Sequence, residues 1–361
     1  MNYFRYALLH LAIILHFSPI IASNSGNEIT PYKFGDNGMP SYEIPASSRF
    51  TTKRISESAP DIVYYLSKPQ ANNYPIVIMC GGSSDQDHIE SIIHFHRYFL
   101  QELIDLGTAV LTVEQWGIDG KNIQIQEFME HYTRSQRLED HQTVIEHLKL
   151  HPPDGWNGKL IFLGVSEGGP LVTALTEKYA DITIATINWS GAGDWSWKEE
   201  VWVYLQRLVV DNTECPHHIH ICDCSTCLEA ITTKKHYEMQ MDATLQNPTP
   251  DQYFLNMTYK YHADAILYPK PNYPKIRTPF LVVAGAEDTI IESSDAFVKN
   301  AKAAGTDITY LRIANMDHYV RKRPDIIQQS FDWLGEQIIN DQIKYFKITP
   351  AIKINIDSLF K

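Results

Sequence analysis

The sequence predicts an α/β fold with a mostly parallel β-sheet covered by helices on both faces. Short runs that are apolar throughout, such as residues 75–80 and 159–164, alternate with longer segments of helical period. Such runs are typical of strands buried on both faces, because a half-exposed strand would carry polar residues at alternate positions. The alternation stops between about residues 195 and 275, which predicts an inserted cap after the sixth strand.

The N-terminus resembles a secretory signal peptide. A single basic residue, Arg5, precedes an apolar run over residues 7–17, and small residues follow at Ala22 and Ser23. The run is too short to cross a bilayer comfortably. We therefore expect residues 1–23 to be removed on export to a secreted or periplasmic location, with an uncleaved N-terminal anchor as the alternative. No later segment of the sequence is apolar for long enough to cross a membrane.

Residues 24–60 are rich in Ser, Pro, Asn and Gly, which predicts an extended leader with strand edges instead of helix. Strands and helices then follow in turn. The strands are expected at 62–66, 75–80, 108–113, 159–164 and 182–189, and the helices at 89–106, 138–150 and 168–179. This order is that of consecutive β-α-β units.

The alternation resumes after the insertion, with a strand at 279–284, a strand at 308–313 and a helix at 324–339. The expected division of the chain is an α/β core at 61–194 and 276–340, an insertion at 195–275 and a C-terminal tail at 341–361.

Composition and charge exclude some partners. The 361-residue chain is 44% hydrophobic, enough for a substantial core, and its formal net charge is -12. An acidic chain without a concentrated basic patch repels phosphate backbones, so nucleic acid is not expected as a partner.

Four of the five cysteines lie in one stretch of the insertion. They are Cys215, Cys222, Cys224 and Cys227. In an oxidising compartment we expect two local disulfides among them. A zinc site with neighbouring His217, His218 and His220 is the alternative, although the cysteine spacing matches no familiar zinc motif. Cys80 is left over and is expected to remain a thiol.

Residues 164–168 read Gly-Val-Ser-Glu-Gly and lie between a predicted strand and a predicted helix. This Gly-x-Ser-x-Gly pattern predicts a sharp strand-to-helix turn that exposes the Ser166 hydroxyl above the sheet. The helix N-terminus and nearby N–H groups would favour negative charge there. A serine nucleophile also needs a base, and the base needs an orienting acid.

The acid and the base are expected after later strands, in the order nucleophile, acid, histidine. Asp288 follows the strand at 279–284, and His318 follows the strand at 308–313. We therefore predict that Asp288 orients His318 and that His318 takes the Ser166 proton. Glu287 and Asp317 are the rival candidates for the acid.

A site for the oxyanion is expected where the strand at 75–80 ends in a Gly-Gly-Ser-Ser turn. The predicted donors are the backbone amides of Gly82 and Glu167, with Ser83 as the alternative to Gly82.

These motifs resemble the α/β-hydrolase superfamily, especially bacterial esterases and serine-aminopeptidase-like members with a Gly-x-Ser-Glu-Gly-Gly elbow. The resemblance covers about residues 61–340, apart from the insertion. It implies the α/β-hydrolase fold and an exported serine hydrolase that cleaves carboxylic esters or related acyl bonds through an acyl-enzyme. The implied substrate is a small acyl compound or a short peptide, with no cofactor and no metal.

Two alternatives remain open. One is a serine aminopeptidase or other peptidase, since loops and caps select the substrate in this fold. The other is a binding protein that has lost its chemistry, against which the presence of Ser166, Asp288 and His318 argues. The sequence leaves the oligomeric state open.

The insertion is rich in large aromatic residues, and most of them are expected to pack it onto the core. They include Trp195, Trp197, Trp202, Tyr204, Tyr253, Tyr259 and Tyr261. A chain inserted after the sixth strand emerges at the carboxyl edge of the sheet, which is the edge that carries Ser166. The insertion is therefore predicted to roof the active site.

Overall fold

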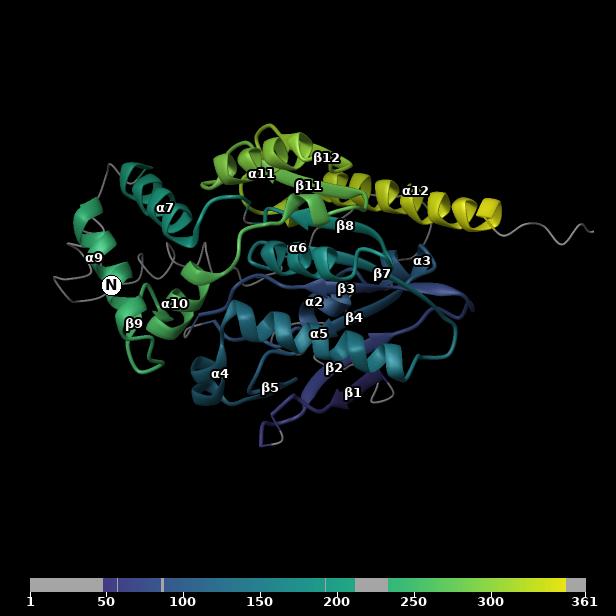
Figure 1. Ribbon diagram of the computed structural model, residues 1–361, viewed down its shortest axis with the longest axis horizontal. Coiled ribbons are helices and arrows are strands. Elements are labelled where there is room, and N and C mark those ends of the chain that lie inside the picture. Colours follow the sequence, from purple (N-terminus) through teal and green to yellow (C-terminus); the bar gives the residue numbers. More distant parts are fainter. Residues whose placement is uncertain (1–47, 57, 86–87, 192, 212–232, 349–361) are drawn as a thin grey trace, which may run out of the picture.

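The computed structural model describes residues 48–348, apart from 57, 86–87, 192 and 212–232 (Figure 1). Its centre is an eight-stranded sheet with the order β1-β2-β4-β3-β7-β8-β11-β12. The strands are β1 (Arg49–Thr52), β2 (Ile62–Ser67), β3 (Tyr74–Cys80), β4 (Ala109–Val113), β7 (Trp156–Val165), β8 (Thr183–Trp189), β11 (Phe280–Gly285) and β12 (Ile308–Ile313). From β4 to β12 all neighbours are parallel, whereas β2 is antiparallel to both β1 and β4. The predicted fold class is confirmed.

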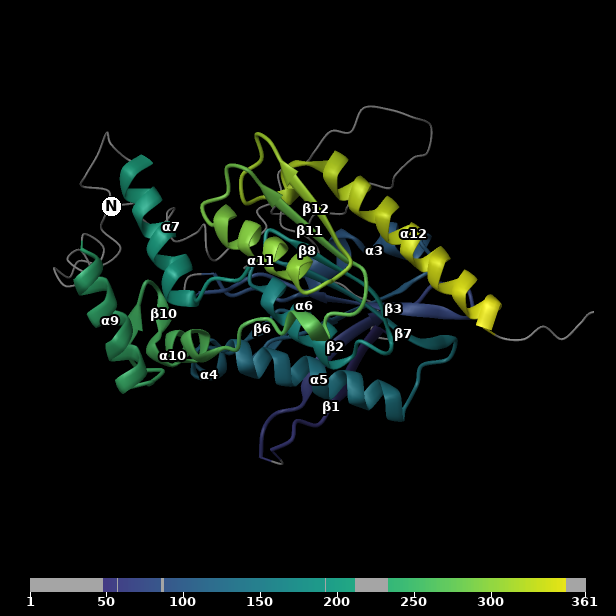
Figure 2. The ribbon, with the colours of Figure 1, turned by 45° about the horizontal axis from the view of Figure 1, so that its top comes forward.

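Helices cover both faces of this sheet. Helices α5 (Arg134–Leu150) and α6 (Gly168–Lys178) pack on one face, and α12 (Pro324–Ile348) packs on the other (Figure 2). Successive residues of β3 alternate between the two layers: Ile76 and Ile78 join the core on the first face, and Val77 and Met79 join the core on the second. Both sets are buried, which is why the strand is apolar throughout.

Two predicted helices have different limits. The expected helix at 89–106 is two short helices, α2 (Ile93–Tyr98) and α3 (Leu100–Asp105), with a break at Phe99. Phe99 leaves helical geometry where its ring meets Trp189 and Phe331. At the other end, α12 continues into the predicted tail because no proline or glycine interrupts it between residues 336 and 348.

Smaller elements complete the core. They are α4 (Ile125–His131), α11 (Ile291–Ala303), the 3-10 turns η3 (Tyr273–Lys275) and η4 (Val320–Lys322), and the hairpin of β5 (Ile118–Asp119) and β6 (Asn122–Ile123). Among the described residues, no helix is long and apolar enough to span a membrane.

The segment between β8 and β11 is mostly helical, although no clear period was expected there. It contains α7 (Trp197–Asp211), α9 (Lys234–Gln246), α10 (Tyr259–Leu267) and the hairpin of β9 (Tyr253–Phe254) and β10 (Met257–Thr258). It follows β8, the sixth strand of the large sheet in chain order. These helices share one apolar cluster, to which residues of β5 and α4 also contribute. The three helices lie together at one end of the molecule (Figures 1 and 2).

Several predictions fall outside the described residues. The clustered cysteines lie within 212–232 and the signal segment lies within 1–47, so both remain predictions. Cys80 is described, and it is a buried free thiol as expected.

Candidate active site

The predicted site residues follow the carboxyl ends of four parallel strands. Gly82 comes after β3, Ser166 after β7, Asp288 after β11 and His318 after β12. Since the carboxyl ends of parallel strands share one edge of the sheet, loops far apart in the sequence meet there.

Ser166 occupies a strained turn between β7 and α6. Its φ angle is 52°, in the left-handed region that non-glycine residues rarely adopt. The Ser166 N–H donates to the Trp189 carbonyl at 2.9 Å, and the Ser166 carbonyl accepts from the Gly169 N–H at 2.8 Å. A Cβ atom on Gly168 would collide with the Cys80 carbonyl oxygen, and one on Gly164 would lie 2.5 Å from the Gly168 carbonyl oxygen. Both elbow glycines are therefore required by close backbone contacts.

The structure brings Ser166, His318 and Asp288 into hydrogen-bonding contact. Nε2 of His318 lies 3.0 Å from the Ser166 hydroxyl oxygen, and Nδ1 of His318 lies 2.8 Å from a carboxylate oxygen of Asp288. The other Asp288 oxygen accepts from the Ile290 N–H at 3.1 Å, which fixes the carboxylate. This is the geometry of a nucleophile, a base and an orienting acid.

The rival acids make different contacts. The side chain of Glu287 is exposed. Asp317 pairs with Lys322 and accepts from the Tyr319 N–H at 2.8 Å. The contact to the imidazole of His318 thus comes from Asp288.

Opposing effects set the pKa of His318. Burial lowers this pKa, but the charge of Asp288 and its hydrogen bond raise it, with further raising contributions from Asp317 and Glu200. The net direction is upward, so the surroundings favour the imidazolium that would form when His318 accepts a proton.

The predicted oxyanion donors lie beside Ser166. A Cβ atom on Gly82 would lie 3.4 Å from Cβ of Ser166, an ordinary van der Waals contact, which places the Gly82 backbone next to the nucleophile. Glu167 follows Ser166 directly. In the described part of the chain neither amide N–H donates a hydrogen bond, which leaves both open to a bound oxygen. Ser83, the alternative to Gly82, is buried and also faces the Ser166 cavities.

Two cavities meet at Ser166 and His318. The first is mainly apolar. Its apolar wall comprises Ile92, Phe95, Phe99, Val165, Trp189 and Val320. The second is lined in part by α7, which contributes Trp197, Glu200, Val201 and Tyr204.

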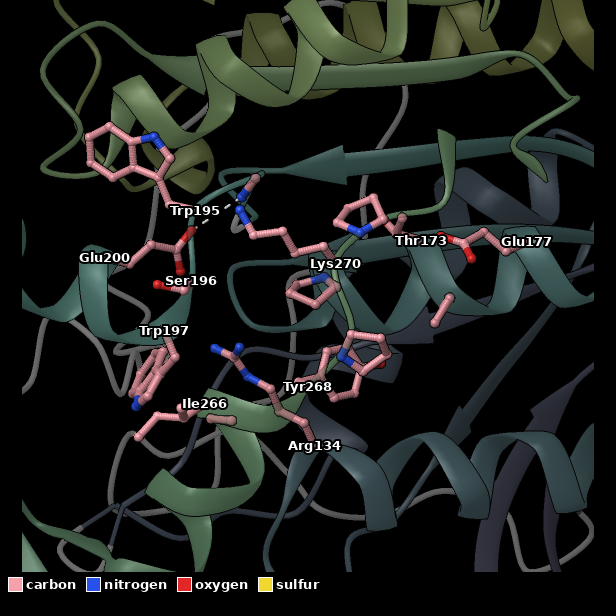
Figure 3. A pocket seen from close by; sticks show the side chains of 16 residues that line it. Arg134, Thr173, Glu177, Trp195, Ser196, Trp197, Glu200, Ile266, Tyr268 and Lys270 are labelled. Atoms are coloured by element: carbon pink, nitrogen blue, oxygen red, sulfur yellow. Dashed lines mark hydrogen bonds between the residues drawn. The ribbon is translucent and has the colours of Figure 1, made fainter. Parts of the chain in front are cut away.

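The second cavity adjoins a third, of about 770 Å³, with which it shares Arg134, Trp197 and Glu200. Arg134 from α5 and Glu200 from α7 both point into this third cavity, and Lys270 and Tyr268 line its other side (Figure 3). The Glu200 carboxylate accepts from Ser293 at 2.6 Å and from the Gly193 N–H at 3.3 Å.

Sequence reasoning missed a buried polar network around the carboxylate of Glu167. One carboxylate oxygen accepts from Nε of Arg134 at 3.0 Å and from the hydroxyl of Tyr261, and the other accepts from Nη1 of Arg137 at 2.9 Å and the hydroxyl of Tyr132 at 2.6 Å. Burial raises the pKa of Glu167, but the two guanidinium groups outweigh it and the net shift is downward. Glu167 is therefore a buried anion.

One signal for this network was present in the sequence. Arg134 and Arg137 lie three positions apart, which places them on one face of a helix. Their partner, Glu167, is distant in the chain and had been considered only for its amide.

One group of side chains has the composition of a metal site. Glu127, Glu130 and His131 on α4 place their ligand atoms within 4.8 Å of one another, and it is the one such group in the described ranges. It contains no residue of the Ser166 site, and exposed acidic groups are common without a metal.

Comparison with known proteins gave a family match. The model of the family described as serine aminopeptidase, S33, matches residues 76–322. The search of curated proteins found no match.

Solved structures are similar in fold. Est1E from Butyrivibrio proteoclasticus is 15% identical, with 81% of this chain and 99% of that chain covered and a TM-score of 0.49. A Bacteroides ovatus structure assigned as a dipeptidyl aminopeptidase IV is 16% identical, with coverages of 79% and 35% and a TM-score of 0.51. A monoacylglycerol lipase from Paleococcus ferrophilus is 16% identical, with coverages of 76% and 99% and a TM-score of 0.48. At these identities the likeness concerns the fold alone.

Proposed function

We propose that this chain, which belongs to the serine aminopeptidase S33 family of α/β hydrolases, cleaves carboxylic esters through an acyl-enzyme on Ser166. The observation that carries the proposal is the pair of contacts made by His318, 3.0 Å to Ser166 and 2.8 Å to Asp288. A neutral imidazole held in this way is a base for the serine proton.

In the acylation step the Ser166 oxygen forms a bond to the ester carbonyl carbon, and the carbonyl π electrons move onto the carbonyl oxygen. The hydroxyl proton of Ser166 passes to Nε2 of His318. The amides of Gly82 and Glu167 donate to the resulting oxyanion. The intermediate then collapses: the bond to the leaving alkoxide breaks, and His318 returns its proton to that oxygen. The acyl group remains on Ser166.

Water completes the cycle. It attacks the acyl carbon while His318 accepts one of its protons, and the bond to the Ser166 oxygen breaks as His318 returns the proton to it. The acid product leaves and the starting state is restored. Each step needs only protein groups, the ester and water.

The cavities support an ester whose two sides occupy different pockets, of which only the one lined by α7 is bordered by the charged side chains of Arg134 and Glu200. The apolar cavity beside Ile92, Phe95 and Trp189 suits an alkyl or aryl group, and the cavity beneath α7 suits a group that can form hydrogen bonds. We infer that the insertion roofs the second cavity and selects its occupant, since Trp197 and Tyr204 belong to its lining. The remaining insertion aromatics include packing residues such as Tyr237, which is fully buried.

A peptidase acting on short peptides is the second candidate. Glu200, whose pKa burial raises, and Arg134 border the cavities next to Ser166, and such polar groups can bind peptide termini or amide groups. The same triad chemistry cleaves amides once they are aligned.

Parallel assays separate the two candidates. Turnover of 4-nitrophenyl butyrate and of aminoacyl 4-nitroanilides is measured for the wild type and for Ser166→Ala. We expect the ester to be turned over much faster than any anilide, with the ester activity abolished in the variant. Faster turnover of the anilides would assign the chain as a peptidase, and ester turnover that survives in Ser166→Ala would overturn the mechanism.

We further propose export with removal of residues 1–23, and two disulfides among the four clustered cysteines. The apolar N-terminal run and the cysteine spacing support this proposal. N-terminal sequencing of the protein from its native host and mass spectrometry under non-reducing conditions test it. An intact N-terminus, or four free thiols, would contradict the respective part.

A further inference from the structure

The buried side chain of Arg137 binds the peptide group between Gly81 and Gly82. The N–H of this peptide group is a candidate oxyanion donor. Nη2 of Arg137 donates to the carbonyl oxygen of Gly81 at 2.6 Å. That carbonyl and the Gly82 N–H belong to one trans peptide group, so they point in opposite directions. Fixing the carbonyl of Gly81 therefore fixes the direction of the Gly82 N–H.

The charge of Arg137 also acts on that peptide group. A hydrogen bond from a guanidinium is charge-assisted, and it polarises the carbonyl that accepts it. Polarisation passes along the peptide, which makes the N–H of Gly82 a stronger donor, because hydrogen bonds in a chain reinforce one another. The low dielectric of a buried site increases this effect.

Glu167 holds the arginine in place and connects it to the second donor. Nη1 of Arg137 lies 2.9 Å from the Glu167 carboxylate, and the backbone N–H of Glu167 is the other candidate oxyanion donor. The hydroxyl of Tyr132 donates to the same carboxylate and accepts from the N–H of Ser84, two residues beyond Gly82. One network therefore binds both loops that supply the oxyanion donors.

A contribution to fold stability does not explain why the side chain of Arg137 is buried at this place. Its side chain is only 5% exposed, and its Nε finds no hydrogen-bond partner within the described residues. A buried guanidinium with an unsatisfied donor costs free energy. Arg137 lines neither of the two cavities at Ser166 nor the third cavity that adjoins them, so direct contact with substrate does not explain it either.

We propose that Arg137 is a positioning residue for the oxyanion site, which orients and polarises the Gly81–Gly82 peptide group while Glu167 anchors its guanidinium. The inference rests on the proposed function, since it requires an oxyanion at Gly82. Arg137 itself does not touch the reacting atoms. Arg137 stabilises the site only once the oxyanion forms. Its substitution should therefore lower kcat more than it changes KM.

The chain contains a matched control in Arg54. Arg54 is 5% exposed at its side chain, forms a two-point ion pair with Asp140 at 2.9 and 2.8 Å, and donates to the carbonyl of Pro60 at 2.6 Å. It thus repeats the contacts of Arg137, an ion pair plus a backbone carbonyl, but it holds no peptide group of the candidate site. Substitution of Arg54 reports the general cost of removing a buried arginine.

The experiment compares Arg137→Gln and Arg54→Gln in the full-length protein. Steady-state hydrolysis of 4-nitrophenyl butyrate is measured per folded molecule, with thermal unfolding recorded in parallel. Loss of a complete oxyanion donor costs on the order of 100- to 1,000-fold in kcat, so a misdirected donor is expected to cost about 10- to 100-fold. Both variants should be destabilised, whereas only Arg137→Gln should lose kcat, with KM little changed.

The inhibition constant of a short alkyl trifluoromethyl ketone distinguishes a positioning role of Arg137 from a purely structural role. Addition of Ser166 to this ketone creates an oxyanion, so its inhibition constant should rise in Arg137→Gln by the same factor by which kcat/KM falls. If Arg137→Gln does not fold, Arg137→Lys replaces it. Lys keeps the charge but lacks the planar fork that spans Glu167 and Gly81, so a smaller loss of the same kind is expected.

Two results would overturn the inference: turnover of the folded Arg137 variant equal to that of Arg54→Gln, or a loss confined to KM with unchanged ketone affinity. Failure of the proposed function is distinguishable. It would appear in the wild type, as ester turnover independent of Ser166 or as absence of ketone inhibition.

Discussion

His318 is subject to two opposing influences, and their balance decides how the site responds to pH. Burial disfavours the charged imidazole, whereas Asp288 favours it through both its charge and its hydrogen bond, and the net pKa is raised. The base must be neutral to accept the Ser166 proton. Activity is therefore expected to fall as the pH is lowered through this raised pKa.

Replacing Asp288 by Asn tests that balance. The substitution removes the largest raising contribution, so burial should dominate and the pKa of His318 should fall. The acid limb of the kcat/KM profile is expected to move to lower pH, while the maximal rate drops by about 1,000- to 10,000-fold because the imidazole loses its orientation. A pH series of ester hydrolysis measures both quantities. Asp317→Asn serves as the control and should retain most of the rate; an unshifted acid limb in Asp288→Asn would contradict the assignment.

At the scale of single residues, sequence reasoning located those side chains whose position follows from local pattern. Ser166, Asp288 and His318 each lie in the short turn or loop that follows a predicted strand, and the parallel sheet brings strand ends together. Arg137 could not be found in the same way. Its significance depends on a contact with Gly81, 56 positions earlier, and an arginine in a helix gives no sign of such a contact.

At the scale of elements, the turn between β7 and α6 does not tolerate added side-chain atoms at its glycines. The start of α6 passes so close to the end of β3 that Gly168 has no room for a side chain against Cys80 and Gly81. This close approach sets Ser166 at the sheet edge beside Gly82. The elbow glycines are thus explained by contacts between elements as well as by the turn itself.

Gly168→Ala should therefore destabilise the protein, by about 3 kcal/mol, because the added methyl group forces β3 and α6 apart. Gly335→Ala is the matched control. It lies inside α12, and its new Cβ would make an ordinary contact, 3.5 Å from Leu106, so a gain of about 0.5 kcal/mol is expected from the higher helix propensity of alanine. Denaturant unfolding of both variants measures the difference. Equal stability of the two would show that the approach of α6 to β3 is not as tight as described.

The elements that sequence reasoning misread have two different physical causes. In α7 the residues Trp197, Val201, Tyr204 and Leu205 do recur at helical spacing and are buried, but nearby aromatic and charged residues obscure that period. The helix expected at 89–106 breaks because Phe99 packs against Trp189 and Phe331, which come from distant parts of the chain. Tertiary packing, which the local sequence pattern does not contain, decided only the second case; in α7 the helical period was present in the sequence.

At the scale of the whole molecule, the order of the sheet determines which loops can cooperate. Strands β3, β7, β8 and β11 are adjacent and parallel, so the loops that carry Gly82, Ser166 and Asp288 emerge at one edge. The segment between β8 and β11 leaves from that same edge, and it lines the cavity next to Ser166. The parallel direction of the strands was predictable from the runs of apolar residues. The lining of the cavity was not, because it depends on how the helices between β8 and β11 pack against β5 and α4.

The central claim, that Ser166 is a nucleophile activated by His318, is tested most directly by covalent labelling with a fluorophosphonate probe. The probe reacts with activated serine hydroxyls, and mass spectrometry of the digested protein identifies the modified residue. We predict one equivalent of label on Ser166, with labelling abolished in Ser166→Ala and strongly slowed in His318→Ala, which retains the hydroxyl but lacks the base. Absence of label on the folded wild type, or equal labelling of Ser166→Ala, would contradict the account.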